Sequence, residues 1–155
     1  MTEKEKQLLL SDISARYMNG LMCVVEGHEG VYQIVGTYRR EGYGAAYAYI
    51  DVAPFGDIII DIVKPYLRPM SSMTEEEREE LIGLLKGGYL DEDTGIISWY
   101  FCHRDGTDAV TNAFFFDTEH ISKFIEFLNT HHFDYRGLIE KGLALEAPEG
   151  MYNLN

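Results

Sequence analysis

The stretch LMCVVEGHEGVYQIVGTY, residues 21–38, decides the fold of this chain. It contains two short runs rich in β-branched and aromatic residues, separated by the polar segment EGHEG. Valine, isoleucine and tyrosine are favoured in strands, and short polar segments that contain glycine connect the strands of hairpins. The stretch therefore predicts an antiparallel β-hairpin.

A helix and a second pair of strands flank this hairpin. Apolar residues spaced four apart within residues 3–17 predict an amphipathic helix, which Asn19 and Gly20 end. Residues 45–52 and 57–63 are strand-like, and the Pro and Gly between them suit a turn. We expect a helix packed on a four-stranded antiparallel meander, which could curl into a small barrel.

The clearest local signal in the second half of the chain is a capping box. Thr74 and Glu77 have the spacing that a capping box requires. Glutamates in the first turn interact favourably with the positive end of the helix dipole, and three leucines form the face expected to be buried. Gly87 and Gly88 are expected to end this helix. Two prolines make residues 64–73 the predicted joint between lobes 1–73 and 74–155, unless both lobes form one compact domain.

The remainder of the second lobe is predicted to be a hairpin, a helix and an irregular tail. Residues 96–104 and 109–116 are strand-like, with Asp105 and Gly106 as a turn between them. Residues 117–132 show the apolar spacing of a helix face. The fold class expected for the whole chain is α+β.

Charge excludes several classes of function. The chain has 13 basic and 26 acidic residues, a net charge of -13. Residues 1–73 carry seven basic and nine acidic residues, so most of the negative charge lies in residues 74–155. Phosphate backbones and anionic membranes attract clustered basic residues, so direct nucleic-acid binding and membrane binding are not expected.

The N-terminus and the cysteines indicate a cytoplasmic protein. The segment MTEKEKQLLLSD has charges of both signs around a short leucine run, unlike a secretory signal. Cys23 and Cys102 lie in apolar strand-like segments, where a buried reduced thiol is the usual state. No G-x-G-x-x-G or Walker pattern occurs, so no nucleotide cofactor is predicted.

The stretch HHFDYR, residues 131–136, holds the candidate site. His131 and His132 could stabilise the end of the preceding helix, because histidines there favour the negative end of the dipole. With Asp134 they could instead bind zinc or another divalent ion, although no second ligand pair has a recognised spacing. A third interpretation is that the imidazoles are exposed and bind a partner.

The next residues allow two further interpretations. Asp134 could cap a short turn, with Arg136 paired to an acidic neighbour. Alternatively, Tyr135 and Arg136 could be exposed anchors of a recognition loop, since both residue types are enriched in binding hot spots. The candidate binding residues are therefore His131, His132, Asp134, Tyr135 and Arg136, and no catalytic residue or metal ligand is assigned. Tyr47 and Tyr49, which alternate on one strand face, could be packed or form a binding platform.

Two segments carry a resemblance. KPYLRPMSSMTEEE, residues 64–77, and HHFDYRGLIEKGLALE, residues 131–146, resemble a family of small uncharacterised proteins from gut Bacteroidales genomes and their phages or prophages. The resemblance implies an accessory, mobile-element-associated protein and supplies no ligand or catalytic residue.

The leading functional hypothesis is a non-catalytic interaction protein of a mobile element or its bacterial host, with an unknown protein partner. One alternative is a metal-binding protein or hydrolase that uses His131, His132 and Asp134. Another is an acidic mimic of nucleic acid that occupies the groove of a basic protein.

Overall fold

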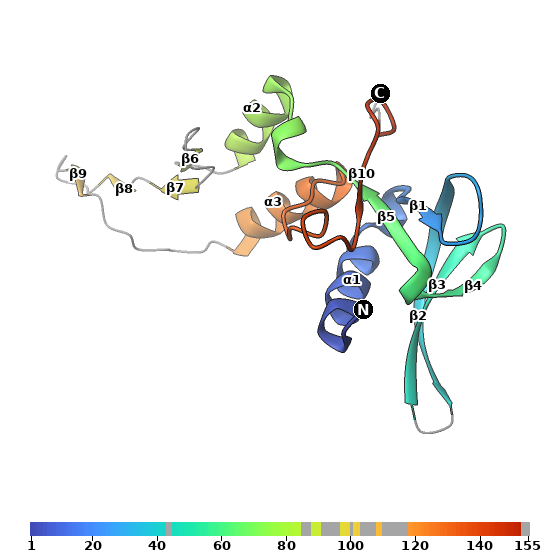
Figure 1. Ribbon diagram of the computed structural model, residues 1–155. Coiled ribbons are helices and arrows are strands. Elements are labelled where there is room, and N and C mark those ends of the chain that lie inside the picture. Colours follow the sequence, from blue (N-terminus) through green and yellow to red (C-terminus); the bar gives the residue numbers. More distant parts are fainter. Residues whose placement is uncertain are drawn as a thin grey trace. The chain divides into compact units, whose positions relative to one another are not determined.

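The computed structural model divides the chain into two compact units (Figure 1). It describes residues 1–42, 45–84, 88–90, 97–99, 101–102, 108–109 and 118–152. The first unit contains Met1–Ser72 together with Leu128–Asn155, and the second contains Met73–Phe127. Residues 128–155, part of the predicted lobe 74–155, thus belong with the N-terminal residues.

The first unit begins with the predicted helix, α1 (Glu3–Arg16). Thr2 and Glu5 form a capping box at its start, which satisfies backbone donors that have no partner within the helix. The helix passes into a short 3-10 turn, Tyr17–Asn19, and Gly20 ends it with a φ of 78°. Glycine adopts this left-handed conformation without steric cost. The N-terminal helix is therefore confirmed.

The sheet of the first unit has six strands in the order β10-β5-β1-β2-β3-β4. β10 pairs in parallel with β5, and every other pairing is antiparallel. The strand bounds are β1 (Met22–Val25), β2 (Tyr32–Gly42), β3 (Ala45–Ala53), β4 (Gly56–Ile59), β5 (Val63–Leu67) and β10 (Leu145–Glu146).

The hairpin predicted for residues 21–38 is confirmed as β1 and β2. The single strand predicted for residues 57–63 is wrong, because the 3-10 turn Ile60–Ile62 divides it into β4 and the start of β5. The turn carries Asp61, which pairs with Lys6 of α1 at 2.8 Å. It redirects the chain so that β5 pairs with β1 instead of extending the β3 ladder.

The sheet is mixed, six-stranded and open, with β10 and β4 at its edges, so a sheet limited to a four-stranded meander and a barrel are not confirmed. Within the predicted joint 64–73, residues 64–67 belong to β5, which pairs on both sides, and the boundary between the two units lies between Ser72 and Met73. Pro65 fits in this strand opposite Cys23. These pairings join residues far apart in the sequence, which local patterns do not specify.

One face of the sheet, called the inner face, packs on α1 (Figure 1). Ser14 of α1 and Thr37 of β2 bring their hydroxyl oxygens to 2.9 Å across this interface. Cys23 is fully buried there, and burial raises the pKa of its thiol to about 12. The core is formed by apolar side chains from α1, the strands and the C-terminal segment: Leu9, Ile13, Leu21, Cys23, Val25, Ile34, Ile50, Val52, Ile60, Val63, Leu67, Leu138 and Leu143.

The second unit contains the capping-box helix, α2 (Glu75–Leu84). Thr74 and Glu77 exchange the two expected hydrogen bonds, at 2.8 and 3.2 Å, so this prediction is confirmed. The predicted stop at Gly87 lies outside the described residues. Short strands follow in two antiparallel pairs: β6 (Gly88–Leu90) with β7 (Ile97–Trp99), and β8 (Phe101–Cys102) with β9 (Asp108–Ala109).

The helix predicted for residues 117–132 is confirmed as α3 (Thr118–Thr130), which crosses from the second unit into the first. The predicted turn at Asp105 and Gly106, and residues 110–116 of the expected partner strand, lie outside the described residues. Among the helices that the structure describes, none combines the length and apolar character needed to cross a bilayer.

Candidate functional site

The candidate residues follow the C-terminus of α3, where the helix ends in a Schellman motif. The amide of Phe133 donates to the carbonyl of Leu128 at 2.9 Å, and the amide of His132 donates to Asn129 at 3.2 Å. His132 occupies the left-handed position with a φ of 59°, where glycine is usual. The chain then runs beside β5, since Arg68 forms a parallel bridge with Phe133.

The His132 side chain is fully buried in the first unit. Its Nε2 lies 3.0 Å from the carbonyl oxygen of Asn19, and its ring stacks on Tyr152 with centroids 4.0 Å apart. Burial lowers the pKa of His132 to about 4, so the ring is neutral at pH 7. Because Asn19 presents an acceptor, Nε2 carries the proton, and Nδ1 has no hydrogen-bond partner in the described structure.

Tyr152 joins this cluster to the sheet. Its hydroxyl donates to the carbonyl of Tyr66 at 2.9 Å and accepts from the amide of Met22 at 3.0 Å. Burial raises the pKa of the Tyr152 hydroxyl, which therefore remains protonated. Tyr152 thus bridges β1 and β5 while its ring covers His132.

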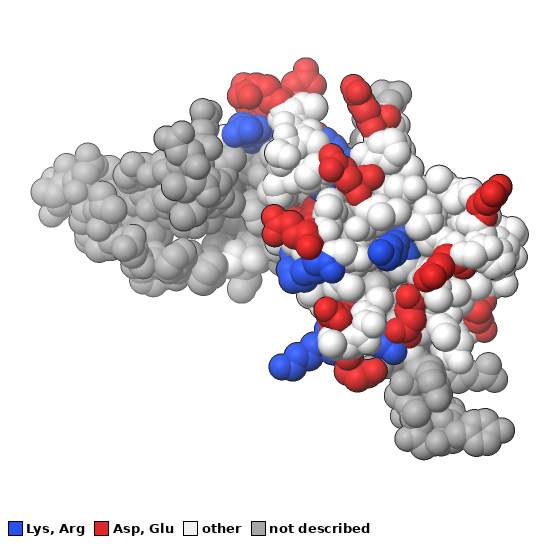
Figure 2. All heavy atoms as spheres, viewed as in Figure 1, with Lys and Arg blue, Asp and Glu red and all other residues white. Residues whose placement is uncertain are grey.

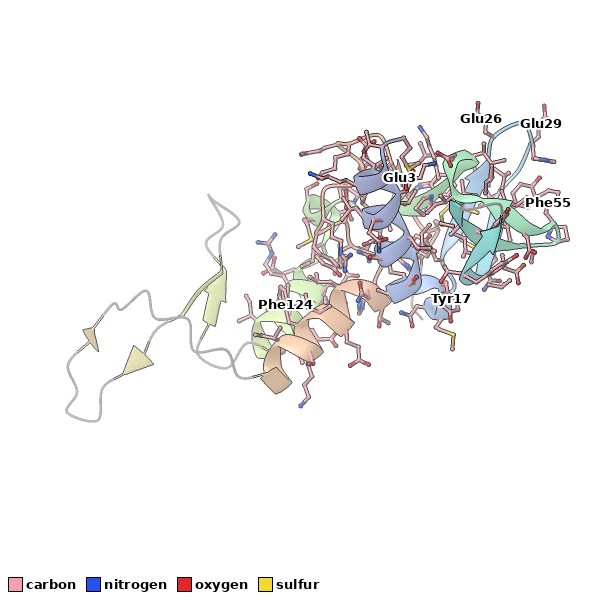
Figure 3. All side chains as sticks on the ribbon, turned by 90° about the horizontal axis from the view of Figure 1, so that it is seen from below. Glu3, Tyr17, Glu26, Glu29, Phe55 and Phe124 are labelled. Atoms are coloured by element: carbon pink, nitrogen blue, oxygen red, sulfur yellow. The ribbon has the colours of Figure 1, made fainter. Side chains whose placement is uncertain are left out.

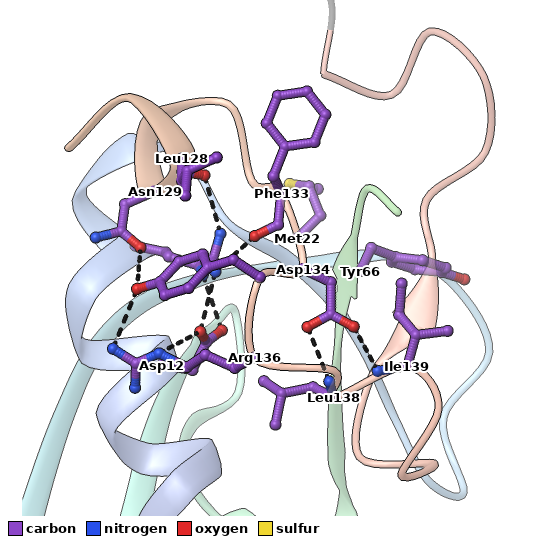
Figure 4. Close-up of polar contacts among 12 residues, drawn as sticks. Asp12, Met22, Tyr66, Leu128, Asn129, Phe133, Asp134, Arg136, Leu138 and Ile139 are labelled. Atoms are coloured by element: carbon purple, nitrogen blue, oxygen red, sulfur yellow. Dashed lines mark hydrogen bonds and ion pairs between the residues drawn. The ribbon is translucent and has the colours of Figure 1, made fainter. Parts of the chain in front are cut away.

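A buried ion pair lies on the α1 side of the same segment (Figure 4). Arg16 makes two hydrogen bonds to the Asp12 carboxylate, at 2.8 and 3.0 Å, and both side chains are fully buried. The remaining guanidinium donors reach the carbonyls of Leu128 at 3.2 Å and Phe133 at 2.8 Å. Burial raises the pKa of Asp12, and the positive charges of Arg16 and Arg136 offset part of that effect.

Tyr135 and Arg136 extend this network. The Tyr135 hydroxyl donates to Asn129 Oδ1 and accepts from Arg136, each at 3.1 Å. Two guanidinium groups lie near its ring, with the central carbons of the Arg16 and Arg136 guanidinium groups 5.1 and 5.2 Å from the ring centroid. Arg136 Nε also lies 3.5 Å from Asp12. Both anchors proposed for a recognition loop are therefore half-buried and hold other parts of the first unit.

Asp134 is buried and faces the turn that follows it. Its two carboxylate oxygens accept from the amides of Leu138 and Ile139, each at 2.8 Å. Its own amide donates to the carbonyl of Arg68 at 2.7 Å. The side chain therefore organises the turn over residues 135–142, in the manner of a cap.

The structure does not gather the predicted residues around one open centre. His132, Asp134 and the Tyr135–Arg136 pair each face a different part of the first unit, and His131 is half-buried, stacked on Phe133 with centroids 6.2 Å apart. Among the residues that the structure describes, no group of three or more His, Cys, Asp or Glu side chains could hold a metal ion.

Asp12, Arg16 and Tyr152 belong to the same cluster but were not selected from the sequence. A signal for two of them exists, because Asp12, Ile13 and Arg16 follow Leu9 by three, four and seven positions. This spacing places both charged residues on the buried helix stripe, where charges are rarely found unless they are paired. No comparable signal marks Tyr152.

Comparisons with protein-family models, curated proteins and solved structures found no match for this chain.

Proposed function

We propose that this chain is a non-catalytic interaction protein that works in the cytoplasm through contacts with another protein. One observation carries the proposal: the Nε2 of His132, the carboxylate of Asp134 and the guanidinium of Arg136 are turned onto groups of the same chain. The chemically versatile residues after α3 therefore stabilise the first unit. The resemblance of residues 64–77 and 131–146 to mobile-element proteins suits an accessory role of this kind.

Catalysis at this cluster would require large rearrangements. A general base must reach a substrate proton, but the His132 ring is fully buried beneath Tyr152. A metal ion bound to Asp134 would compete with two backbone amides that already donate to its carboxylate. Unpaired buried donors are costly, at about 1 to 3 kcal/mol each. These contacts favour the interaction hypothesis over the metal-binding or hydrolase alternative.

A direct test combines metal analysis with partner capture. Protein purified without chelator is analysed for metals, alongside the variant Asp134→Asn. Near-stoichiometric metal in the wild type that is lost in the variant would contradict the proposal. The proposal expects no such metal.

For capture, tagged protein is cross-linked in cells and recovered under denaturing conditions. We expect one partner at near-equal amounts, bound as well by Asp134→Asn as by the wild type, provided that circular dichroism shows both to be folded. Failure to recover any partner across growth conditions would count against the proposal.

A further inference from the structure

The two faces of the six-stranded sheet differ in what covers them. Ile50 and Ile34 point to the inner face and are fully buried, whereas their neighbours on the opposite, outer face remain accessible. Val35 is 45% exposed and Ile59 is 43% exposed, which is high for β-branched residues in a sheet. In Figure 1, no described helix or strand of the first unit covers β2, β3 and β4 on the side turned away from α1.

Strand register arranges the outer face in two rows. Tyr38, Tyr49 and Ile59 are directly opposite one another across β2, β3 and β4. The rings of Tyr38 and Tyr49 stack with centroids 5.6 Å apart and planes inclined by 14°. We call these three side chains the aromatic row. The side chains of residues 39–47, farther along β2 and β3, are outside the described part of this face.

The second row, called the acidic row, consists of Gly36, Asp51 and Asp57, again directly opposite one another. Gly36 has no side chain, and a Cβ placed there would lie 3.4 Å from the Cβ of Asp51. Like charges opposite each other destabilise a sheet. Among the described side chains, neither Asp51 nor Asp57 has an ion-pair partner to offset this repulsion.

The segments that carry these rows are acidic, whereas basic residues follow Tyr38 in β2, at Arg39 and Arg40, and lie elsewhere on the first unit (Figure 2). Residues 17–38 and 48–63 contain five acidic residues, Glu26, Glu29, Asp51, Asp57 and Asp61, and no lysine or arginine. Of the five, Asp61 is paired with Lys6. A ligand over the acidic row therefore meets two carboxylates without an ion-pair partner among the described side chains, beside two half-buried tyrosines and the exposed Ile59. This combination complements a basic segment with apolar neighbours.

We infer that the outer face of β2, β3 and β4 binds an extended basic segment of the partner protein. Its arginine or lysine lies over the acidic row, and an apolar side chain two positions away lies over the aromatic row. The spacing fits, because the two rows are two residues apart along each strand, as are side chains on one side of an extended peptide. This inference rests on the proposed function and specifies the partner's chemistry.

A second copy of the chain is a poorer occupant. Each copy would bring its own Asp51 and Asp57 to the interface, and each carries a net charge of -13. Face-to-face packing would thus place like charges together where water is excluded, which is unfavourable. A basic partner relieves the same repulsion.

The test uses a short synthetic peptide with blocked ends, in which isoleucine and arginine lie two positions apart among threonine residues. A second peptide carries glutamate in place of arginine. Binding to the full chain is followed by amide chemical shifts in nuclear magnetic resonance spectra. We expect the arginine peptide to shift residues 36–38, 49–51 and 57–59, with an affinity that falls as salt is added. The glutamate peptide should not bind.

Two double variants remove the same charge from different places. Asp51→Asn with Asp57→Asn should weaken binding of the arginine peptide about tenfold, as expected for the loss of two surface ion pairs. Glu26→Gln with Glu29→Gln, in the loop between β1 and β2 at the end of the sheet (Figure 3), should weaken binding much less, because these two carboxylates lie outside both rows.

Three outcomes would overturn the inference: equal binding of both peptides, equal affinity of both double variants, or self-association through residues 36–59 without peptide. The proposed function is judged separately. If a captured partner is retained by Asp51→Asn with Asp57→Asn, the inference fails while the proposed function stands.

Discussion

Arg16 donates a hydrogen bond to the carbonyl oxygen of Phe133 at 2.8 Å, although 117 positions separate them in the chain. The same guanidinium is held by Asp12 one helical turn away. A buried charged pair is thereby used to attach the C-terminal segment to α1. Removing this pair should lower the stability of the first unit more than removing any single surface charge does.

The variant Arg16→Met should lower the free energy of unfolding by about 3 to 5 kcal/mol, because it leaves the buried Asp12 carboxylate with only the longer contact to Arg136, at 3.5 Å. Urea denaturation measures this loss. The matched control is Lys6→Met, a change on the same helix that breaks the more exposed ion pair between Lys6 and Asp61. It should lower the free energy of unfolding much less.

Replacing Asp12 by Leu in the Arg16→Met background should cost less than the sum of the two single changes, since no charge is then left buried. Additive losses would show that the two side chains do not act as a pair.

Acid should destabilise the protein through His132. Unfolded histidine has a pKa of about 6.5, whereas the folded value is about 4. As pH falls between these values, the unfolded state takes up a proton that the folded state does not, so stability is lost in this window and no further below it. The loss from this one group is about 3 kcal/mol.

The comparison is with His132→Asn, because asparagine tolerates a positive φ and does not titrate. The difference in unfolding free energy between the two proteins, measured by urea denaturation at pH 7, 5.5 and 4.5, should shrink as pH falls. A difference independent of pH would contradict the burial of a neutral ring.

Asp134→Ala should loosen the turn over residues 135–142. The change leaves the amides of Leu138 and Ile139 without an acceptor and should cost about 2 to 4 kcal/mol. Hydrogen exchange at these two amides should accelerate, and Asp134→Asn, which keeps one acceptor, should lie between Ala and wild type. Glu140→Gln, exposed in the same turn, is the control and should leave both exchange rates unchanged.

Tyr152→Phe should remove the hydrogen bonds by which Tyr152 holds β1 and β5, without changing the ring that covers His132. Loss of the hydroxyl leaves the Met22 amide and the Tyr66 carbonyl unpaired, at a cost of about 1 to 3 kcal/mol. The sensitive measurement is the exchange rate of the Met22 amide. An unchanged rate would mean that Tyr152 does not hold β1.

The Cys23 thiol should be unreactive in the folded protein. Burial raises its pKa to about 12, so little thiolate forms at pH 8, and the sulfur is also inaccessible. In a Cys102→Ser background, alkylation by iodoacetamide at pH 8 should be slow until urea unfolds the chain. Rapid labelling without urea would contradict the burial of Cys23 on the inner face of the sheet.

Local features were predictable from the sequence, and long-range ones were not. The capping box at Thr74 and the helix over residues 118–130 depend on side chains within one or two turns of each other. The parallel pairing of Leu145 with Tyr66 depends on chain regions far apart. Periodicity reports which side of an element is apolar, but it does not report which strand will lie beside it.

The candidate site shows the same limit. The sequence located the segment 131–136 and offered helix termination as one role, and the Schellman motif at His132 has that geometry. It could not indicate that Asp134 faces Leu138 and Ile139 rather than a ligand, because that depends on how the turn closes. The positive φ of His132 also went unpredicted, since glycine is the residue usually expected there.

The grouping of residues 1–72 with 128–155 has a consequence for synthesis on the ribosome. When Asp12, Arg16 and the first five strands emerge, β10 and the carbonyls of Leu128 and Phe133 have not yet been made. The nascent chain must therefore hold a core that lacks Leu138, Leu143 and Ala144, with one edge of β5 unpaired, until translation has passed residues 73–127 and reached β10. We expect this growing intermediate to be a natural client of ribosome-associated chaperones.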